Sequence, residues 1–515
     1  MTTPTATGGP APVDHRRLAR AGGLALGGFV VSAILQLGLV LVVTHGLGRT
    51  EAGVVLEAVA IFSLVSAWVG FGADTGLVRW LSALLATHRT WQLRPVIVTA
   101  LVPVVIVATL AGAVLWVIAP WLSTLVFNGS HTPATTEALR LLALFLPFGT
   151  VAGIAAAGSR GLSRIVPYVA IVNVGIPGAR IVAVALAVVF AGSLTSVLVA
   201  WSMPLVVAAL VAVAILWAAA GRIAAGDHAE PEAGRAPGLR REFWSFAAPR
   251  GLATICGQTI SWLDVVLVGA FTSPRNAAVY AAASRIAILG AYALQAAGMV
   301  ISPEFSRHHT LRDWEGLGAL YRQATVWTVM LGWPFYVSVV AFPAVLMRVF
   351  GHDYTIGATA LAIIGAAQLV NLATGNITFV LLMTGRSRLN LLNATLACTV
   401  NVALNLLLIP RYGITGAALA WAATIVGVNM LELGEAWRAI RLRPFSRRYA
   451  GAAAAVLVCW GAAAAVARLA AGQSVAAFAA YLVIGALGYV VVLARSPETA
   501  GVRTLLAVGL KPNDA

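Results

Sequence analysis

The chain has 515 residues, of which 60% are hydrophobic and 10% are charged, and its formal net charge is +16. So much apolar sequence excludes an ordinary soluble protein and indicates a polytopic membrane protein. The three cysteines, Cys256, Cys398 and Cys459, lie in apolar runs without CxxC or Cys/His spacing, so neither a metal site nor a disulfide framework is expected.

The first hydrophobic segment, "GGLALGGFVVSAILQLGLVLVV", follows Arg16, Arg17 and Arg20. This order resembles a signal peptide, but the run is too long and lacks a small-residue cleavage site before a soluble domain. The segment is therefore predicted to remain as a transmembrane helix.

Fourteen segments are apolar over the roughly 20 residues that a spanning helix needs. Period-2 alternation typical of a barrel is absent, so every span is predicted to be a helix. The predicted spans are 22–44, 52–74, 95–118, 137–158, 166–190, 194–219, 243–271, 276–302, 318–349, 358–383, 389–409, 413–436, 449–469 and 475–495.

Arginines gather in alternate loops between these segments, whereas the opposite loops hold at most one each, such as Arg49, Arg275 and Arg411. The positive-inside rule therefore predicts that both termini are cytoplasmic. Membrane topology thus accounts for most of the net charge, and nucleic acid is not an expected partner. Residues 221–242, rich in Gly, Ala, Pro and charge, are predicted to form a cytoplasmic linker.

The two sides of this linker resemble each other. "LSRIVPY" (162–168) aligns with "RSRLNLL" (386–392), and "SLTSVLVAW" (193–201) aligns with "ITGAALAW" (414–421), at an offset near 225 residues. Six helices per half give both halves the same orientation, so they are predicted to be parallel repeats about an axis along the membrane normal. Two such bundles enclose a central cavity, on which alternating access can operate by rocking one bundle against the other.

The expected organisation has six parts. They are a cytoplasmic N-tail (1–20), an N-lobe of six helices (21–220), the linker (221–242), a C-lobe of six helices (243–440), two extra helices (441–496) and a cytoplasmic C-tail (497–515). The two extra helices fall outside the repeat. They either face lipid at the periphery or form a wall that shelters an acyl or prenyl tail.

Three stretches carry a family resemblance. "LLMTGRSRLNLLNATLACTVNVALNLLLIPRYGITGAALAWA" (381–422) resembles helices 10–12 of bacterial polysaccharide exporters, "LDVVLVGAFTSPRNAAVYAAASRI" resembles their helices seven and eight, and "FGADTGLVRWLS" (71–82) resembles the end of helix two. The superfamily is the multidrug/oligosaccharidyl-lipid/polysaccharide exporters, and the chain is most similar to the branch that flips undecaprenyl-linked oligosaccharides. The resemblance implies V-shaped lobes, a cationic central cavity for a lipid diphosphate, a lipid tail along the outside, and a bacterial cell membrane.

Ionisable residues inside predicted spans are the candidate site residues, because charge in a bilayer is costly. Asp264, within "SWLDVVLVGAF", and Arg285 lie on neighbouring antiparallel spans, so an ion pair between them is favoured over direct contact of Asp264 with substrate. Arg250 has no acidic residue nearby. It either clamps a diphosphate through its planar guanidinium or extends to the cytoplasmic headgroups.

The N-lobe offers further candidates. Arg180 and Glu57 both lie towards the outer side, where an ion pair is the simplest interpretation. Arg79 lies at the cytoplasmic mouth, where it could meet an incoming headgroup. Uncharged polar residues could bond sugar hydroxyls or, more commonly, neighbouring helices; they are Gln258, Thr259, Gln295, Asn371 and Asn376.

The leading functional hypothesis is a flippase that moves a polyprenyl-diphosphate-linked oligosaccharide to the external leaflet for cell-surface polysaccharide synthesis. No Walker A motif occurs, so this chain is not expected to hydrolyse ATP, and no cofactor, metal or catalytic residue is predicted. The expected partners are the lipid-linked oligosaccharide and membrane lipids, with a polysaccharide polymerase or glycosyltransferases of the same pathway as candidates.

Three other functions stay open. A drug exporter on the same scaffold would be expected to favour acidic and aromatic lining, whereas arginine predominates among the mid-membrane charges of the second half. A membrane-embedded glycosyltransferase or polymer ligase needs catalytic acids near a large external loop, but the longest such loop, "LSTLVFNGSHTPATTE", has one acidic residue. The third is a membrane scaffold without transport.

Overall fold

The computed structural model describes residues 15–127, 133–226, 238–383 and 387–495. Within these ranges the secondary structure is helical throughout, with no strand. This agrees with the predicted all-α membrane fold, since a helix satisfies its backbone amides and carbonyls within one segment. Eleven helices are long and apolar enough to cross a membrane, among the described residues. The predicted number of fourteen spans is not established by this count.

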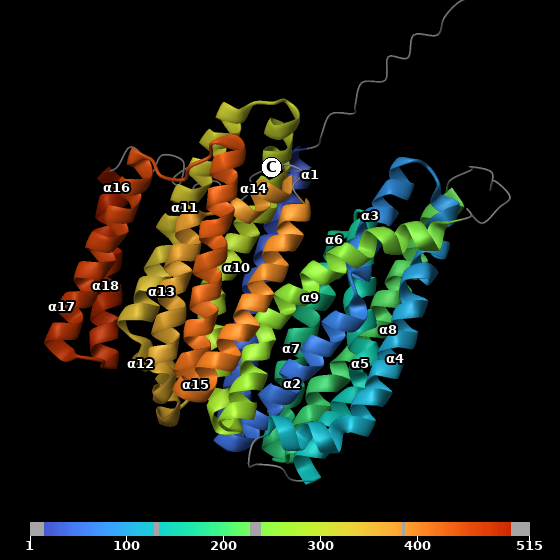
Figure 1. Cartoon of the computed structure of the whole chain (residues 1–515), viewed down its shortest axis with the longest axis horizontal. Helices are drawn as coiled ribbons and strands as arrows, with labels where there is room; N and C mark the ends of the chain where they lie inside the picture. The colour runs from blue at the N-terminus through green and yellow to red at the C-terminus, as the bar shows by residue number, and fades with distance from the viewer. Residues whose placement is uncertain (1–14, 128–132, 227–237, 384–386, 496–515) are drawn as a thin grey trace, which may run out of the picture.

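The helices fall into two bundles that stand side by side and diverge towards the upper side of Figure 1. The first bundle is built mainly from α1 (His15–Gly46), α2 (Arg49–Gly70), α3 (Ala73–Ala86), η1 (Thr90–Gln92), α4 (Leu93–Val126), α5 (Pro133–Gly161), α6 (Ile165–Tyr168), η2 (Val169–Gly175), α7 (Ile176–Phe190) and α8 (Leu194–Gly226). Its core forms where α5 packs against both α4 and α8.

The second bundle contains α9 (Leu239–Phe271), α10 (Pro274–Thr310), α11 (Trp314–Ala341), α12 (Pro343–Arg348), η3 (His352–Gly357), α13 (Ala358–Thr374), α14 (Ile377–Met383) and α15 (Ser387–Ile440). The segment α15 consists of two helices that meet at a kink at Gly413 (φ 55°, ψ −131°), in agreement with the two spans predicted there. At the outer flank, α16 (Arg447–Val456), η4 (Leu457–Gly461), α17 (Ala462–Ala471) and α18 (Val475–Arg495) lie on the far side of α11 from the first bundle (Figure 1).

Helix α9 joins the two bundles. It packs against α3 and α4 of the first bundle as well as against α10 and α15 of the second. Between α2 and α3 the chain bends at Phe71 and Gly72, both with positive φ. A side chain at Gly72 would strike the backbone of Ala247 and Gly251 on α9, so glycine allows this close approach of two main chains.

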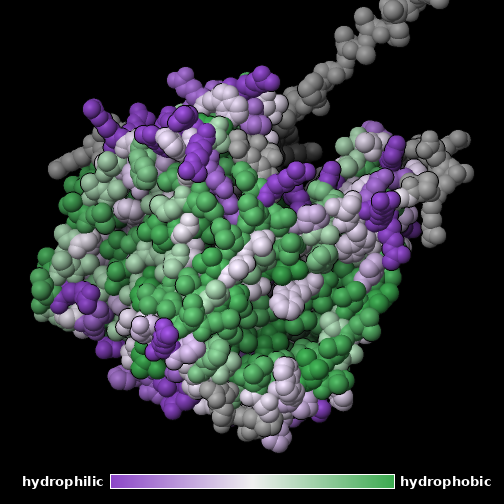
Figure 2. Space-filling model, viewed as in Figure 1, coloured by the Kyte–Doolittle hydropathy of each residue, from purple (hydrophilic) through white to green (hydrophobic). Residues whose placement is uncertain are grey.

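The distribution of apolar and hydrophilic side chains on the surface is that expected of a membrane protein. Figure 2 shows apolar side chains across the middle of the molecule and hydrophilic ones gathered along its upper edge, over the ends of α10, α11 and α16. Arg307 and Arg447, two arginines on the predicted cytoplasmic side, lie at such helix ends, and Arg322 lies in the third turn of α11. Most of the predicted linker and the predicted C-tail lie outside the described residues.

Candidate functional site

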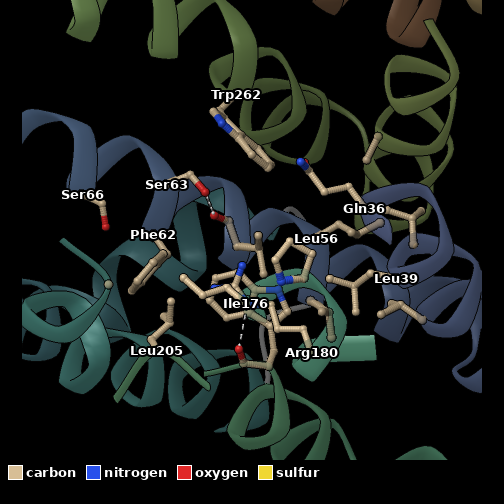
Figure 3. A pocket seen from close by; sticks show the side chains of 18 of the residues that line it. Gln36, Leu39, Leu56, Phe62, Ser63, Ser66, Ile176, Arg180, Leu205 and Trp262 are labelled. Carbon is tan, nitrogen blue, oxygen red and sulfur yellow. Dashed lines mark hydrogen bonds between the residues drawn. The ribbon is translucent and has the colours of Figure 1, made fainter. Parts of the chain in front are cut away.

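A cavity of about 340 Å³ lies where the two bundles meet. The first bundle contributes side chains from α1, α2, η2, α7 and α8 to its wall, together with two glycines of α5. The second bundle contributes Trp262 of α9 with Ala281 and Arg285 of α10. Figure 3 shows Trp262 on one side of this space and Arg180 on the opposite side. The lining is largely apolar; the side chains that bring nitrogen or hydroxyl groups are Gln36, Ser63, Ser66, Arg180, Trp201, Trp262 and Arg285.

Arg180 is held on a tryptophan of the neighbouring helix. Its guanidinium carbon lies 3.6 Å from the centroid of the Trp201 ring, and its Nε donates a hydrogen bond of 3.0 Å to the Trp201 carbonyl oxygen. Trp201 is itself fixed by an edge-to-face contact with Phe62, with ring centroids 5.3 Å apart. The backbone bond uses one of the five N–H donors of the guanidinium, so the stacked fork keeps donors for a ligand in the cavity.

Arg285 reaches the same cavity from the second bundle. Its guanidinium carbon lies 4.0 Å from the centroid of the Trp262 ring. Each bundle therefore supplies one arginine resting on a tryptophan face, an arrangement that combines cation–π attraction with a fixed orientation of the planar group. Among the described residues that line the cavity, none is acidic, so its local charge is positive.

The predicted ion pair between Glu57 and Arg180 is not formed. Glu57 on α2 is fully buried and faces Gly269 of α9, whose added Cβ would strike the carboxylate. Neither of its carboxylate oxygens has a hydrogen-bond partner among the described residues. The prediction failed because Arg180 is directed onto Trp201 of α8, whereas Glu57 points to the contact between the bundles.

The predicted ion pair between Asp264 and Arg285 is not formed either. Asp264 is 2% exposed, and its carboxylate accepts hydrogen bonds from the Tyr280 hydroxyl at 2.8 Å and from the Asn405 amide at 2.7 Å. Both partners are neutral, and they come from α10 and α15. The side chain on α10 that meets Asp264 is thus Tyr280, more than one helical turn from Arg285, and Asp264 ties three helices of one bundle together.

Arg79 and Arg250 come together away from the cavity wall. Their guanidinium carbons lie 3.8 Å and 4.8 Å from the centroid of the same ring, that of Phe246. Arg79 belongs to α3 and Arg250 to α9, and both side chains are exposed. Neither forms an ion pair within the described ranges, so the two make an open cationic pair where α3 meets α9.

One of the five uncharged polar candidates, Asn371, bonds a neighbouring helix. Asn371 donates to Gln368 and accepts from Asn429 on α15, and Thr374 donates to Asn429 as well. Asn376 is buried, and its amide has no hydrogen-bond partner among the described residues. Thr259 is buried and Gln258 is half-buried. The side chain of Gln295 lies outside the described residues.

Several functional neighbours escaped prediction. Trp201 and Trp262 are among fifteen tryptophans, and nothing in their spacing marks the two that support arginines. Asn401 and Asn405 are four residues apart, which places both amides on one helix face. Two amides on one face of an apolar helix indicate a buried polar partner, which the structure shows to be Asp264.

Metal ligands of the usual kind are not gathered anywhere in the described part of the chain: no group of three or more His, Cys, Asp or Glu side chains could hold an ion. The Asp264 cluster offers oxygen atoms, which suit hard cations, but it contains only one carboxylate. That carboxylate already accepts two hydrogen bonds.

Sequence comparison identifies similar families. The profile of the family described as "Polysaccharide biosynthesis protein" matches residues 18–309, and the MatE profile matches residues 249–407. A curated relative, the "Probable low-salt glycan biosynthesis flippase Agl15" of Haloferax volcanii, is 24% identical over 193 residues. That match spans 37% of this chain and 41% of the length of the relative.

Solved structures share the fold. A lipid II flippase MurJ in an inward closed conformation aligns with a TM-score of 0.68 at 13% identity, covering 92% of this chain and 98% of that one. An inward-facing multidrug resistance MATE family transporter aligns with a TM-score of 0.61 at 14% identity, covering 82% and 98% of the two chains. These named relatives are flippases and transporters.

Proposed function

The chain belongs to the polysaccharide biosynthesis protein family, within the multidrug/oligosaccharidyl-lipid/polysaccharide exporter superfamily, and from that membership we propose a specific activity. The protein is a flippase that moves a polyprenyl-diphosphate-linked oligosaccharide from the cytoplasmic to the external leaflet of a bacterial cell membrane. Both termini are cytoplasmic, and the flipped lipid supplies cell-surface polysaccharide synthesis. Polymerases or glycosyltransferases of that pathway are its candidate partners.

The observation that carries this proposal is the pair Arg180 and Arg285 in one cavity, one from each bundle. A guanidinium binds two phosphate oxygens with two parallel N–H···O bonds, a geometry that a point charge cannot reproduce. Both side chains are cationic and no described residue of the lining is acidic, so a dianionic group matches the charge of the cavity. A diphosphate offers paired oxygen atoms to both guanidinium groups and carries the opposite charge.

The location of the pair gives it a role in alternating access. Because Arg180 moves with the first bundle and Arg285 with the second, rocking of the bundles changes the distance between the guanidinium groups. A diphosphate held between them would favour the arrangement in which both can bind it. Separation of the bundles at either end would weaken one contact and release the headgroup to that side.

Arg79 and Arg250 are the proposed first contact for the headgroup. They are exposed on α3 and α9, share the Phe246 ring, and by the positive-inside prediction face the cytoplasm. A lipid diphosphate would meet this pair before it enters the cavity. The lipid tail would stay outside, in contact with the apolar surface.

A drug exporter on the same scaffold is the alternative, since the fold is shared with a multidrug transporter. Hydrophobic cations would be repelled by a cavity whose lining charges are both arginine. The two functions predict opposite substrate charge, so they are separable by experiment.

The function is tested in a strain that lacks the chain. Extracted polyprenyl lipids should contain more lipid-linked oligosaccharide than the wild type, and intact cells should shield it from a membrane-impermeant glycan-oxidising reagent. Complementation should restore both values. An unchanged leaflet distribution, together with reduced efflux of a cationic dye, would instead favour the drug exporter.

A further inference from the structure

A second recess of about 310 Å³ lies far from the central cavity, between α11 and the beginning of α16. None of its lining residues also lines the central cavity. It is formed by Ala319, Arg322, Gln323 and Val326 of α11 with Ser446, Arg447 and Arg448. The flippase proposal assigns it no role, because α16 follows the two predicted six-helix repeats.

The recess has a strong positive charge without a counter-charge. Three of its seven lining residues are arginines, and none is acidic. Over the ranges that the structure covers, Arg322, Arg447 and Arg448 form no ion pair and donate no side-chain hydrogen bond to protein. Three guanidinium groups gathered in one concavity repel one another, so an anion bound among them offsets that repulsion.

Further donors converge on the same space. Gln323 supplies an amide from α11. Ser446 caps α16 by accepting a hydrogen bond of 3.1 Å from the Tyr449 backbone N–H, while N–H groups of the first turn stay without an intrahelical partner. Donors thus reach the recess from two helices that are distant in sequence, as expected of a site for a small polyanionic group.

One lining residue of the recess, Val326, belongs to the packing between α11 and α16. Val326, Met330 and Ala452 form a buried cluster between α11 and α16, and Tyr449 packs against it. A volume near 310 Å³ is at the lower end of the range for small-molecule sites. The recess therefore fits a small anionic headgroup.

We propose that this recess binds a phosphate-ester anion at the cytoplasmic surface of the membrane. The chemistry is that of the phosphodiester of an anionic phospholipid such as phosphatidylglycerol, and a soluble phosphate ester presents the same group. Hydrophilic side chains gather over this corner of the molecule (Figure 2), on the side that the arginine distribution places in the cytoplasm. Basic recesses between membrane helices on that side are suited to anionic lipids.

The test uses the purified full-length chain in detergent and measures its thermal unfolding midpoint as phosphatidylglycerol, phosphatidylcholine or inorganic phosphate is added. Phosphatidylglycerol should raise the midpoint more than phosphatidylcholine does. In the double variant Arg447→Gln/Arg448→Gln, the phosphatidylglycerol concentration for half of the effect should rise about tenfold or more, because charge-assisted hydrogen bonds are lost.

The matched control is Arg441→Gln/Arg443→Gln. It removes the same net charge from the segment just before α16, but these arginines stack on Trp437 and do not line the recess. It should keep the wild-type response. If the double variant of the recess does not elute as a single folded species, Arg322→Gln replaces it in the comparison.

The outcomes separate the sources of the anion. Protection of the wild type by inorganic phosphate, lost in the recess variant, assigns the site to a soluble phosphate ester; protection by phosphatidylglycerol alone assigns it to lipid. Equal effects of the two phospholipids without any effect of phosphate would overturn the proposal. So would an equal loss of response in the recess and control variants.

Discussion

The Oδ1 atom of Asp264 on α9 accepts a hydrogen bond of 2.7 Å from the amide of Asn405 on α15, 141 residues further along the chain. The other carboxylate oxygen accepts from Tyr280 on α10. A carboxylate inside an apolar bundle is therefore compensated by two neutral donors and not by an arginine. The cluster fixes the relative position of three helices on one side of the central cavity.

Loss of either donor should destabilise the protein. Tyr280→Phe leaves one carboxylate oxygen without its bond, which costs about 1–3 kcal/mol for a buried group. A double-mutant cycle of Tyr280→Phe with Asp264→Asn, followed by chemical or thermal unfolding, should show clear coupling. The same cycle with Arg285→Gln should be additive within about 0.5 kcal/mol. Stronger coupling of Asp264 to Arg285 than to Tyr280 would refute the arrangement.

The contact between the bundles should depend on a small residue of α2 where this helix meets the beginning of α10. An added Cβ at Gly53 would overlap the backbone of Pro274 at the beginning of α10. Gly53→Ala should therefore push the bundles apart at this end, which the predicted topology places outside. With the three native cysteines replaced, a cysteine at the cavity residue Leu56 should react faster with an external maleimide in this variant.

Gly427→Ala is the control for that experiment, because nothing lies within 4 Å of its added Cβ. It should leave the labelling rate of the Leu56 position unchanged. An unchanged rate in Gly53→Ala as well would show that the contact between α2 and α10 does not keep this end closed.

The sequence predicted the helical membrane fold because a bilayer leaves few alternatives for an apolar chain. It also singled out Arg180 and Arg285, which the structure brings into one cavity, and Arg79 and Arg250, which share a ring. The ion pairs were wrong for a physical reason. Opposite charge and similar depth do not fix the rotation of a helix about its axis, and rotation decided whether Asp264 met Tyr280 or Arg285.

Substitutions of Arg250 test the proposal that Arg79 and Arg250 make the first contact with the headgroup. Arg250→Lys should keep membrane abundance but transport more slowly, because an ammonium cannot bind two phosphate oxygens in the planar geometry of guanidinium. Arg250→Ala should lose more. Accumulation of lipid-linked oligosaccharide is the measurement. Full transport by the lysine variant would show that Arg250 merely extends to the headgroups of bulk lipid.

Topology can be checked at the end of α8. Residues 221–242 are predicted to be cytoplasmic, and Ala225 lies in the last turn of that helix. A single cysteine at Ala225 should resist a membrane-impermeant maleimide in intact cells and react after permeabilisation. Efficient labelling in intact cells would reverse the predicted orientation and place the open arginine pair on the external side.

The central claim is that Arg180 and Arg285 hold an anionic headgroup between the bundles. Arg140 offers a matched control, because it contacts a tryptophan in the same way as Arg180 but lies outside the cavity. Its guanidinium carbon lies 4.5 Å from the Trp116 ring centroid, and its Nε donates a hydrogen bond to the Trp116 carbonyl oxygen. Arg140→Gln removes an arginine stacked on tryptophan without touching the cavity.

The decisive measurement is the rate at which purified chain in proteoliposomes exposes a fluorescent polyprenyl-diphosphate oligosaccharide to an impermeant glycan-oxidising reagent. Arg180→Gln and Arg285→Gln should each lower this rate about tenfold or more, because each removes a charge-assisted contact to the diphosphate. Arg140→Gln should flip at the wild-type rate. Wild-type flipping by both cavity variants, or an equal loss in all three, would contradict the account.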